Sequence, residues 1–299
     1  MIDEAIDNLP FVTLAFGRFA LSQIHVAFDD APRPSTTELD ELIATEWDRQ
    51  VRMARESGAV LFDGKMLRYV DHTVQVDSAS GDRILDLTVG PTGYRDFVGT
   101  NLYNSHRIKD FGWHRFSNPV GTTATLTSSD GQVCYGRRSS KVAFHAGHVH
   151  TLGGALEAKD QTSSGEADPF ASVRRELAEE VALYPPDILD LWCSGLIRDK
   201  QICQPELLFE GTIRLTADEL RERWRHAESK DEHAEIVTVP DTSDTLVPFI
   251  TRCGPIAPVA VGALLLHGRH TWGEAWFRRA AVKLSGRTGP AGKDSPDAY

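Results

Sequence analysis

The order of the expected strands and helices predicts an α/β (α+β) protein. Short segments rich in β-branched and aromatic residues indicate strands in both halves of the 299-residue chain. Segments with apolar residues three and four positions apart indicate helices between and after these strands. Hydrophobic residues make up 41% of the sequence and charged residues 25%, which suits a globular protein with one large core or two moderate ones.

The first third of the chain is expected to form strands around one long helix. Residues 11–28 mix β-branched and aromatic side chains and predict one or two strands. Thr36 or Thr37 can cap a helix that continues through residues 38–57. Residues 60–87 alternate in polarity and contain turn signals, so they predict a small antiparallel sheet.

The next segment, 88–101, is dense in glycine and in side chains that form hydrogen bonds. Such a composition does not form a regular strand throughout, and it predicts an ordered loop that leads into a short helix. As a structural loop, it would pack Tyr94 and Phe97 against the sheet. As a substrate loop, it would present Arg95 and Asn101 to a phosphate or a ribose.

The remaining elements alternate between strands and helices. Strands are expected at residues 122–127, 133–137, 141–151, 189–202, 205–212 and 235–239. Helices are expected at residues 217–226, where Thr216 and Glu219 form a capping box, and in the apolar segments 258–269 and 272–284. The last residues, 285–299, contain few apolar side chains and are expected to be disordered.

Three histidines, His145, His148 and His150, fall in the strand expected at residues 141–151. In a strand, His148 and His150 share a face while His145 points the other way. We therefore expect ordinary strand histidines here rather than a metal cluster.

A helix after residue 169 carries the clearest chemical signal. Glu176, Glu179 and Glu180 would share one face of this helix, because residues three and four positions apart are neighbours. Apolar residues line the other face at helical spacing: Phe170, Val173, Leu177 and Val181. A solvated charged face is the ordinary explanation of such a cluster. Like charges within one turn repel one another, however, and a bound cation would relieve that repulsion.

The residues around this helix resemble the Nudix box. Gly153-Gly154 and Glu157 precede the run Arg175-Glu176-Leu177-Ala178-Glu179-Glu180, as in enzymes that hydrolyse a nucleoside diphosphate linked to another group. Two departures are visible, since an insertion around residues 161–168 separates the glycines from the helix and Ala182 replaces the final glycine. Because of the insertion, Glu157 and Glu166 are both candidates for the middle glutamate of the box.

The resemblance implies a Nudix-fold α/β/α sandwich with a mixed sheet over residues 118–284, preceded by a β-rich α+β domain over residues 1–117. The N-terminal domain would contribute to the substrate pocket. Three further segments, LFDGKMLRY, GYRDFVGTN and GRRS, resemble Nudix hydrolases that act on UDP-glucose and UDP-galactose. GYRDFVGTN is the more specific of these signals, because it lies outside the common Nudix domain.

The resemblance also implies roles for individual residues. The metal ligands would be Glu176, Glu179, Glu180 and Gly154. The catalytic residues would be Glu176, Glu180, Arg175 and Glu235, with Glu232 as the alternative to Glu235. The substrate contacts would be Tyr94, Arg95, Asp96, Asn101, Arg137, Arg138, Gly153 and Glu157. Magnesium suits these oxygen ligands, with Mn²⁺ as a substitute.

The expected function is therefore the hydrolysis of a UDP-sugar to UMP and a sugar 1-phosphate. Two alternatives remain: a Nudix pyrophosphatase for another substrate, such as ADP-ribose or NADH, and a nucleotide sensor without catalysis. A net charge of −11 disfavours non-specific binding to nucleic acid or anionic lipid. We expect a cytoplasmic protein without membrane segments or a disulfide framework, because long apolar runs and CxxC spacings are absent.

Overall fold

The computed structural model describes residues 2–56, 58, 60–78, 80–142, 144–160 and 166–285. Eight of the described strands form one mixed sheet, and three form a second sheet. The order along the larger sheet is β1 (Phe11–Phe19), β9 (Ile188–Asp199), β10 (Pro205–Ile213), β5 (Gly121–Thr127), β6 (Gln132–Arg138) and β11 (His233–Pro240). β7 (Val149–His150) pairs with β6, and β8 (Leu152–Ala155) pairs with β5.

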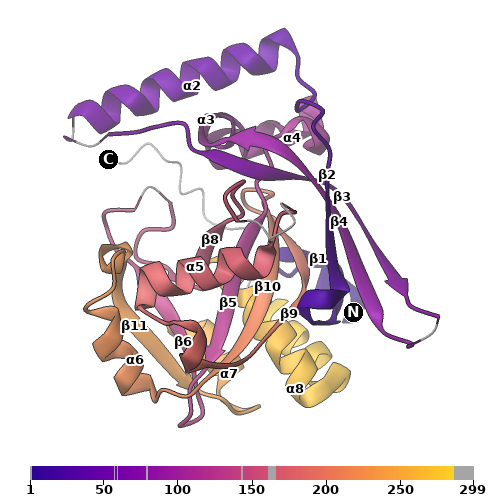
Figure 1. Ribbon diagram of the computed structural model, residues 1–299, viewed down its shortest axis with the longest axis vertical. Helices are drawn as coiled ribbons and strands as arrows, with labels where there is room; N and C mark the ends of the chain where they lie inside the picture. Colours follow the sequence, from indigo (N-terminus) through magenta and orange to yellow (C-terminus); the bar gives the residue numbers. More distant parts are fainter. Residues whose placement is uncertain are drawn as a thin grey trace.

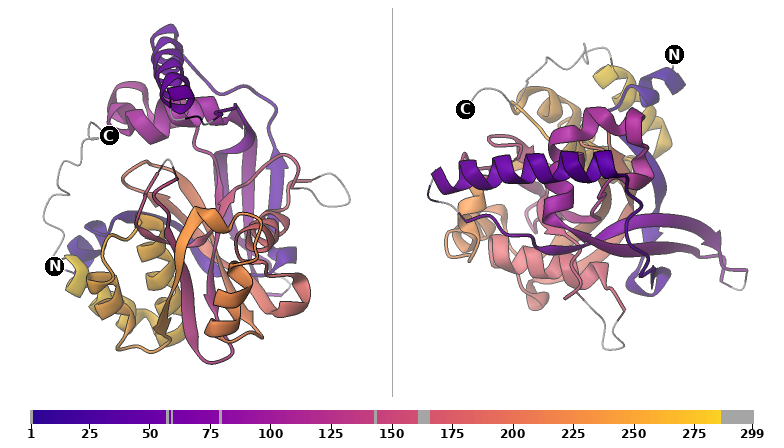
Figure 2. Two further views of the ribbon diagram at one scale, coloured as in Figure 1. Left: turned by 90° about the vertical axis from the view of Figure 1, so that its left-hand side faces the viewer. Right: turned by 90° about the horizontal axis from the view of Figure 1, so that it is seen from above.

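Helices cover both faces of the larger sheet (Figures 1 and 2). One face carries α5 (Pro169–Val181) and α6 (Ala217–Trp224), and the other carries α1 (Ile2–Asp7), α7 (Leu246–Arg252) and α8 (Pro258–Ser285). Leu207 of β10 packs in the core under α5, whereas the next residue, Leu208, packs under α8. This alternation is that of a strand buried on both faces, and it confirms the expected α/β/α layering.

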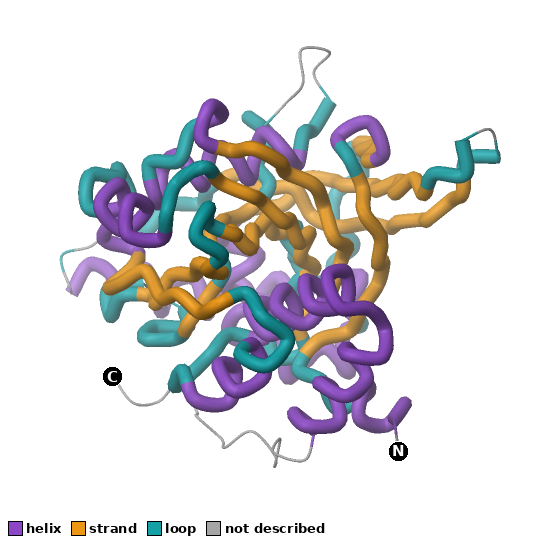
Figure 3. Tube along the Cα trace, turned by 90° about the horizontal axis from the view of Figure 1, so that it is seen from below, coloured by secondary structure: helices purple, strands orange, loops and turns teal. Residues whose placement is uncertain are grey.

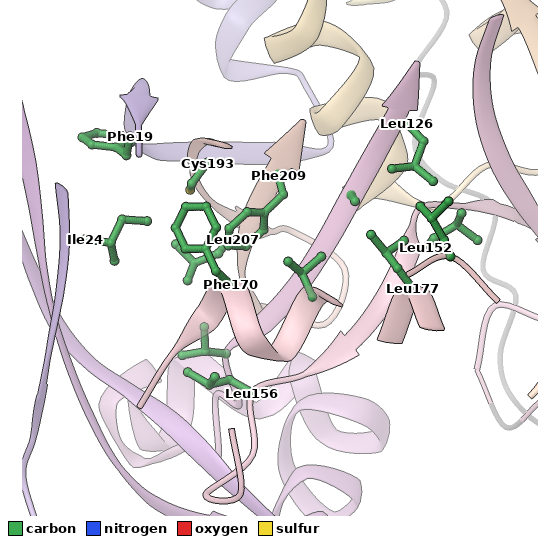
Figure 4. Close-up of a cluster of buried hydrophobic side chains, with 14 of the residues drawn as sticks. Phe19, Ile24, Leu126, Leu152, Leu156, Phe170, Leu177, Cys193, Leu207 and Phe209 are labelled. Atoms are coloured by element: carbon green, nitrogen blue, oxygen red, sulfur yellow. The ribbon is translucent and has the colours of Figure 1, made fainter. Parts of the chain in front are cut away.

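The core under α5 is built from aromatic and aliphatic side chains of the helix and the sheet. The ring of Phe170 meets the ring of Phe209 edge to face, with centroids 4.9 Å apart. Figure 4 shows Phe170 and Leu177 directed from the helix toward Leu207, Phe209 and Leu152. The expected apolar stripe of this helix is therefore confirmed, and its burial leaves the glutamate face of the helix for other contacts.

The smaller sheet has the order β2 (Ile24–Phe28), β4 (Arg83–Gly93) and β3 (Lys65–Val76). The β3–β4 hairpin extends away from the larger sheet (Figure 3). After β4 the chain forms α3 (Tyr94–Phe97) and a π turn, η2 (Val98–Leu102), and α2 (Thr37–Glu56) packs on that turn. The contact is close, because a Cβ on Gly99 would lie 2.6 Å from the Cα of Ile43.

The other short elements connect these layers. They are α4 (Ile108–Phe111) and the 3₁₀ turns η1 (Leu21–Gln23), η3 (Ser105–Arg107), η4 (Trp113–Arg115), η5 (Pro185–Asp187) and η6 (Lys230–Glu232). At α6, the capping box expected from the sequence is present, since Thr216 Oγ1 accepts from the Glu219 amide and Glu219 Oε2 accepts from the Thr216 amide.

Several expected elements differ from the structure. Only Val149–His150 of the strand expected at residues 141–151 is a strand, because turns occupy most of the residues before it. β4 continues to Gly93, so the expected loop 88–101 starts later than its glycine content suggested. α8 is interrupted at Gly273, where φ is +81°, so the break falls at the second residue of the helix expected at 272–284.

The expected domain division after residue 117 stays a prediction. β1 nevertheless pairs with β9 in the larger sheet, so Phe11–Phe19 share a sheet with strands from the second part of the chain. The expected disordered tail lies outside the described residues apart from Ser285, which ends α8.

Candidate active site

The candidate site lies where α5 passes over β8. Asp168 caps the helix, since its Oδ1 accepts hydrogen bonds from the backbone amides of Phe170 and Ala171. Ala182 ends the helix in a left-handed conformation, with φ at +51° and ψ at +39°. A glycine at this position would adopt that conformation without strain, so the alanine that departs from the Nudix pattern keeps the backbone shape of the glycine.

The glycine pair of β8 allows the helix to approach the strand. A Cβ on Gly153, where φ is +143°, would lie 2.2 Å from the carbonyl oxygen of Thr122. A Cβ on Gly154 would lie 2.4 Å from Oε1 of Glu176. The amide of Gly153 donates a hydrogen bond of 2.8 Å to Oε2 of Glu180. Gly153 therefore allows the close approach of β5 and orients Glu180 through its amide, whereas Gly154 leaves room for the carboxylate of Glu176.

Arg175 forms the centre of the charge network. Its Nη1 donates to Oε1 of Glu176 at 2.7 Å and to Oε2 of Glu179 at 3.3 Å. Its Nε and Nη2 donate to the two carboxylate oxygens of Asp160, at 2.8 Å and 3.1 Å. Burial acts to lower the pKa of Arg175, but its hydrogen bonds to Asp160 and the charge of Glu176 raise the pKa well above its ordinary value.

Asp160 is a residue that sequence reasoning missed. It is 4% exposed, it binds Arg175 with both oxygens, and its Oδ2 also accepts from the amide of Glu157. Burial raises its pKa, but the hydrogen bonds from Arg175 and from Glu157 lower it overall. It lies outside the box pattern, and the only available signal was an acidic residue just before the insertion.

The carboxylates of α5 are strongly coupled. Burial raises the pKa of Glu176 to about 7, the charge of Arg175 opposes this rise, and the charges of Glu180 and Glu179 add to it. Glu180 is 1% exposed. Within the described residues, no group of three or more His, Cys, Asp or Glu side chains is arranged to hold a metal ion as it stands. Arg175 already binds two of these glutamates, and their hard oxygen donors and mutual repulsion fit a divalent cation.

Glu232 and His233 join the site from the start of β11. The pairing of β11 with β6 is irregular between His233 and Glu235, so the strand contains a bulge there. Nε2 of His233 lies 3.5 Å from Oε2 of Glu180, and the ring is packed against Gly136. Burial raises the pKa of Glu232, and the charge of Glu180 adds to the rise. Residue patterns did not point to His233, because they do not show the bulge that turns it toward α5.

Glu235 points away from this site, which corrects the expectation that it is catalytic. Its Oε1 accepts a hydrogen bond of 2.6 Å from Nε of Arg137, and Arg137 also donates to the carbonyls of Gly147 and Cys253. The neighbouring residues Val237 and Val239 pack in the core under α8. The alternative residue, Glu232, is the one that faces the carboxylates of α5.

Side chains alternate between the two faces of β6, so Arg137 and Arg138 lie on opposite faces of the sheet. Arg137 faces the α8 side, so its expected contact with substrate is also corrected. Arg138 faces the α5 side, and its Nε donates to the carbonyl of Phe144. Its charge lowers the pKa of Tyr94 and of Glu232, although burial, the larger influence, raises both. Arg138 therefore lies between the carboxylates and the N-terminal part of the chain.

The three histidines come together, contrary to the strand geometry. His145 has a φ of +55° in the turn before β7, and its ring centroid lies 5.0 Å from that of His148 and 5.9 Å from that of His150. Burial lowers the pKa of His145 to about 3 and lowers that of His150 well below its ordinary value. The expectation that they are not metal ligands stays a prediction, although its geometric reason was wrong.

The substrate contacts expected at residues 94–96 differ in their exposure to solvent. Tyr94 lines a cavity beside Ala155 and Glu157, and Arg95 is exposed. Asp96 accepts a hydrogen bond of 3.0 Å from Nε of Arg33.

Asn101 is fully buried, and its Nδ2 donates to Oδ1 of Asn118 and to the carbonyl of Ile202. Its amide thus connects segments of the fold, and this corrects the expectation that it contacts substrate.

Of the two candidates for the middle glutamate, Glu157 lies nearer to the arginine. Its Oε1 is 3.7 Å from Nη2 of Arg175, and its Oε2 is 3.3 Å from Nζ of Lys159. Glu166 is exposed. Most of the insertion, residues 161–165, lies outside the described residues. We retain Glu157 as the proposed residue of the box.

Comparison with known proteins supplies the family. No protein-family model matches the chain. Uridine diphosphate glucose pyrophosphatase NUDT22 of Mus musculus is 26% identical over 279 residues, covering 84% of this chain and 87% of that protein. Nudix hydrolase 9 of Arabidopsis thaliana is 24% identical over 255 residues, covering 73% of this chain and 78% of that protein. The chain is thus similar over most of its length to relatives that are named as Nudix hydrolases.

Among solved structures, a mutT/nudix family protein from Listeria innocua aligns with a TM-score of 0.37 and 18% identity. That alignment covers 52% of this chain and 94% of the Listeria protein. The residues that resemble the Nudix box lie in the α5–β8 unit described above. In the described part of the chain, none of the helices combines the length and apolar character needed to span a membrane.

Proposed function

We propose that this chain is a divalent-metal-dependent pyrophosphatase that hydrolyses UDP-sugars to UMP and a sugar 1-phosphate. The observation that carries the proposal is the cluster of buried and half-buried glutamates that α5 presents over Gly153 and Gly154, braced by Arg175. The substrate class is supported by the relatives named uridine diphosphate glucose pyrophosphatase, one of which matches 84% of the chain.

Glu176, Glu179 and Glu180, with the carbonyl of Gly154, would hold the cation, with Mg²⁺ as the proposed ion and Mn²⁺ as a substitute. When bound, such a cation neutralises phosphate charge and lowers the pKa of a coordinated water. Hydrogen bonds within the chain position these ligands in the absence of the ion. Arg175 and Asp160 fix the positions of two glutamates, and the amide of Gly153 fixes Glu180.

The diphosphate would lie between α5 and Arg138. Arg138 is a suitable contact because its guanidinium faces the carboxylate side of the sheet and supplies positive charge for phosphate oxygens. Glu232 faces the same space, and burial keeps its pKa above the ordinary value. A glutamate with a raised pKa can accept a proton from water near neutral pH, so Glu232 is our candidate for the general base.

The decisive experiment is incubation of the full chain with UDP-glucose and Mg²⁺, followed by separation of UMP from the remaining nucleotide. The matched variant is Glu180→Gln, which keeps the shape of a side chain that is 1% exposed. We expect this variant to lose about 100-fold or more in kcat, because changes to groups that only support metal ligands already cost 10- to 100-fold. Its circular dichroism should match that of the unmodified chain.

Three other results would contradict parts of the proposed function. Cleavage of ADP-ribose without release of UMP from UDP-glucose would reject the substrate and keep the reaction class. Binding of UDP-glucose without hydrolysis of any dinucleotide would favour a sensor. Full activity of Glu180→Gln would reject the role of α5.

A further inference from the structure

A cavity of about 500 Å³ opens beside the carboxylate site. Ala155 and Glu157 of the Nudix box line one side, and the segment from Val60 to Met66 lines the other, with Tyr94 between them. Ala155 also receives a hydrogen bond from Arg175 through its carbonyl oxygen. The cavity is therefore continuous with the charge network around α5, and it joins the two parts of the chain.

Two large apolar side chains at this cavity are exposed. The side chain of Phe62 is 74% exposed and that of Val60 is 89% exposed, and neither belongs to a buried core cluster of the described residues. Exposed aromatic rings add little to folding stability, because the free energy of burial is not gained. An exposed aromatic ring in a concave site is typical of a surface that a ligand covers.

The segment that carries Phe62 is fixed in place. The amide of Tyr94 donates to the carbonyl of Gly64 at 2.9 Å, and the amide of Arg95 donates to Oδ1 of Asp63 at 2.9 Å. A Cβ on Gly93 would lie 2.5 Å from the same Oδ1 of Asp63, so the glycine permits this contact.

The ring of Tyr94 is also held, since it meets the ring of Trp47 edge to face with centroids 6.3 Å apart. Both aromatic side chains of the cavity thus belong to one connected unit.

The chemistry of the walls distinguishes between the two ends of a nucleotide sugar. Apolar and aromatic side chains form most of the wall: Val60, Leu61, Phe62, Met66 and Tyr94. A hexose presents hydroxyl groups that lose hydrogen bonds against such a wall, whereas a nucleobase presents a flat π face. Lys65 and Lys159 also line the cavity, where their charge can meet the adjoining phosphate.

We propose that this cavity binds the nucleobase of the substrate, with Phe62 stacking on the base, so that the sugar end lies away from the 60–66 segment. This inference rests on the proposed pyrophosphatase function. It assigns specificity for the base to Phe62 and Tyr94.

The test compares Phe62→Leu, which keeps an apolar side chain but removes the ring, with Phe62→Tyr, which keeps the ring. Tyr184→Leu is the control, because Tyr184 is a 51% exposed aromatic residue that does not line this cavity. Calorimetric titration with UMP and with glucose 1-phosphate measures the two ends separately. Steady-state hydrolysis of UDP-glucose then gives KM and kcat.

We expect Phe62→Leu to weaken UMP binding about tenfold, since the variant loses the stacking of a base on an aromatic ring. KM should rise by a similar factor while kcat stays within about twofold, because the ring acts on binding rather than on chemistry. Phe62→Tyr and Tyr184→Leu should leave UMP affinity unchanged.

Unchanged UMP affinity in Phe62→Leu would overturn the inference, and so would a loss confined to glucose 1-phosphate. If the unmodified chain hydrolyses no nucleotide sugar, the proposed function fails, but the UMP titration still decides whether a base binds at Phe62.

Discussion

The face of a strand on which a residue lies determines whether its side chain reaches the site. Glu232 ends the turn η6 just before β11, and the bulge between His233 and Glu235 directs these two strand residues to different sides of β11. Glu232 faces the carboxylates of α5, whereas Glu235 forms an ion pair with Arg137, with its side chain 55% exposed. The two glutamates therefore provide a matched test of the site geometry.

We expect Glu232→Gln to lower kcat by about 100- to 10,000-fold, the range that a general base contributes. Glu235→Gln should leave kcat within about twofold, because exposed ion pairs contribute little. Steady-state kinetics on UDP-glucose measure both variants, with thermal unfolding as the check on folding. Equal losses in the two variants would contradict the placement of the bulge.

At the level of elements, the contact between β8 and α5 depends on two glycines that have different neighbours. A Cβ on Gly153 meets backbone atoms of Thr122 and Thr123, which cannot move aside. A Cβ on Gly154 meets only the carboxylate of Glu176, at the end of a flexible side chain. The first contact therefore affects the stability of the fold, and the second affects the position of a proposed metal ligand.

Gly153→Ala should therefore lower the free energy of unfolding by about 1–3 kcal/mol through backbone strain alone, with the clash adding to it. Gly154→Ala should change stability less but should displace Glu176 and lower activity. Chemical denaturation and UDP-glucose hydrolysis distinguish the two effects. A Gly154→Ala protein with normal kcat would show that Glu176 has room to adjust.

Sequence patterns predicted the elements that depend on local information. The apolar stripe of α5, the capping box of α6 and the hairpin of β3 and β4 follow from spacing, caps and turns, and the structure contains each of them. The bulge in β11, the turn that gathers His145 and His148, and the Asp160–Arg175 pair depend on contacts between distant segments. The spacing of apolar residues along the sequence does not report contacts between distant segments, so these features were missed or misplaced.

For the whole molecule, a buried charge cluster on the α8 side links stability to pH. His267 lies between Glu210 and Asp241, with ring nitrogens 3.0 Å and 2.9 Å from their carboxylates. Burial lowers the pKa of His267, but the hydrogen bonds that its ring donates to Asp241 and Glu210 outweigh this effect and raise the pKa to about 9.

Because the folded pKa is raised, this cluster stabilises the fold fully below the ordinary histidine pKa of about 6.5 and loses its effect as pH rises through about 9. We expect the free energy of unfolding to fall across this interval in the unmodified chain and to fall less in His267→Gln. The control is His226→Gln, since the side chain of His226 is 77% exposed. Denaturation curves at a series of pH values measure the difference, and parallel curves for all three proteins would contradict it.

The pairing of β1 with β9 has a consequence for how the chain is made. Phe11 faces Asp199, so the first strand meets its partner only after almost two hundred residues have left the ribosome. Until then β1 presents unpaired backbone groups and the apolar side chains of Phe11, Ala15 and Phe19, which are buried in the finished fold. Closing the long loop between β1 and β9 is slow. An unpaired strand with exposed apolar side chains can meanwhile pair with other chains and aggregate. Yield of intact protein in a cell should therefore depend on how well this strand is shielded during synthesis.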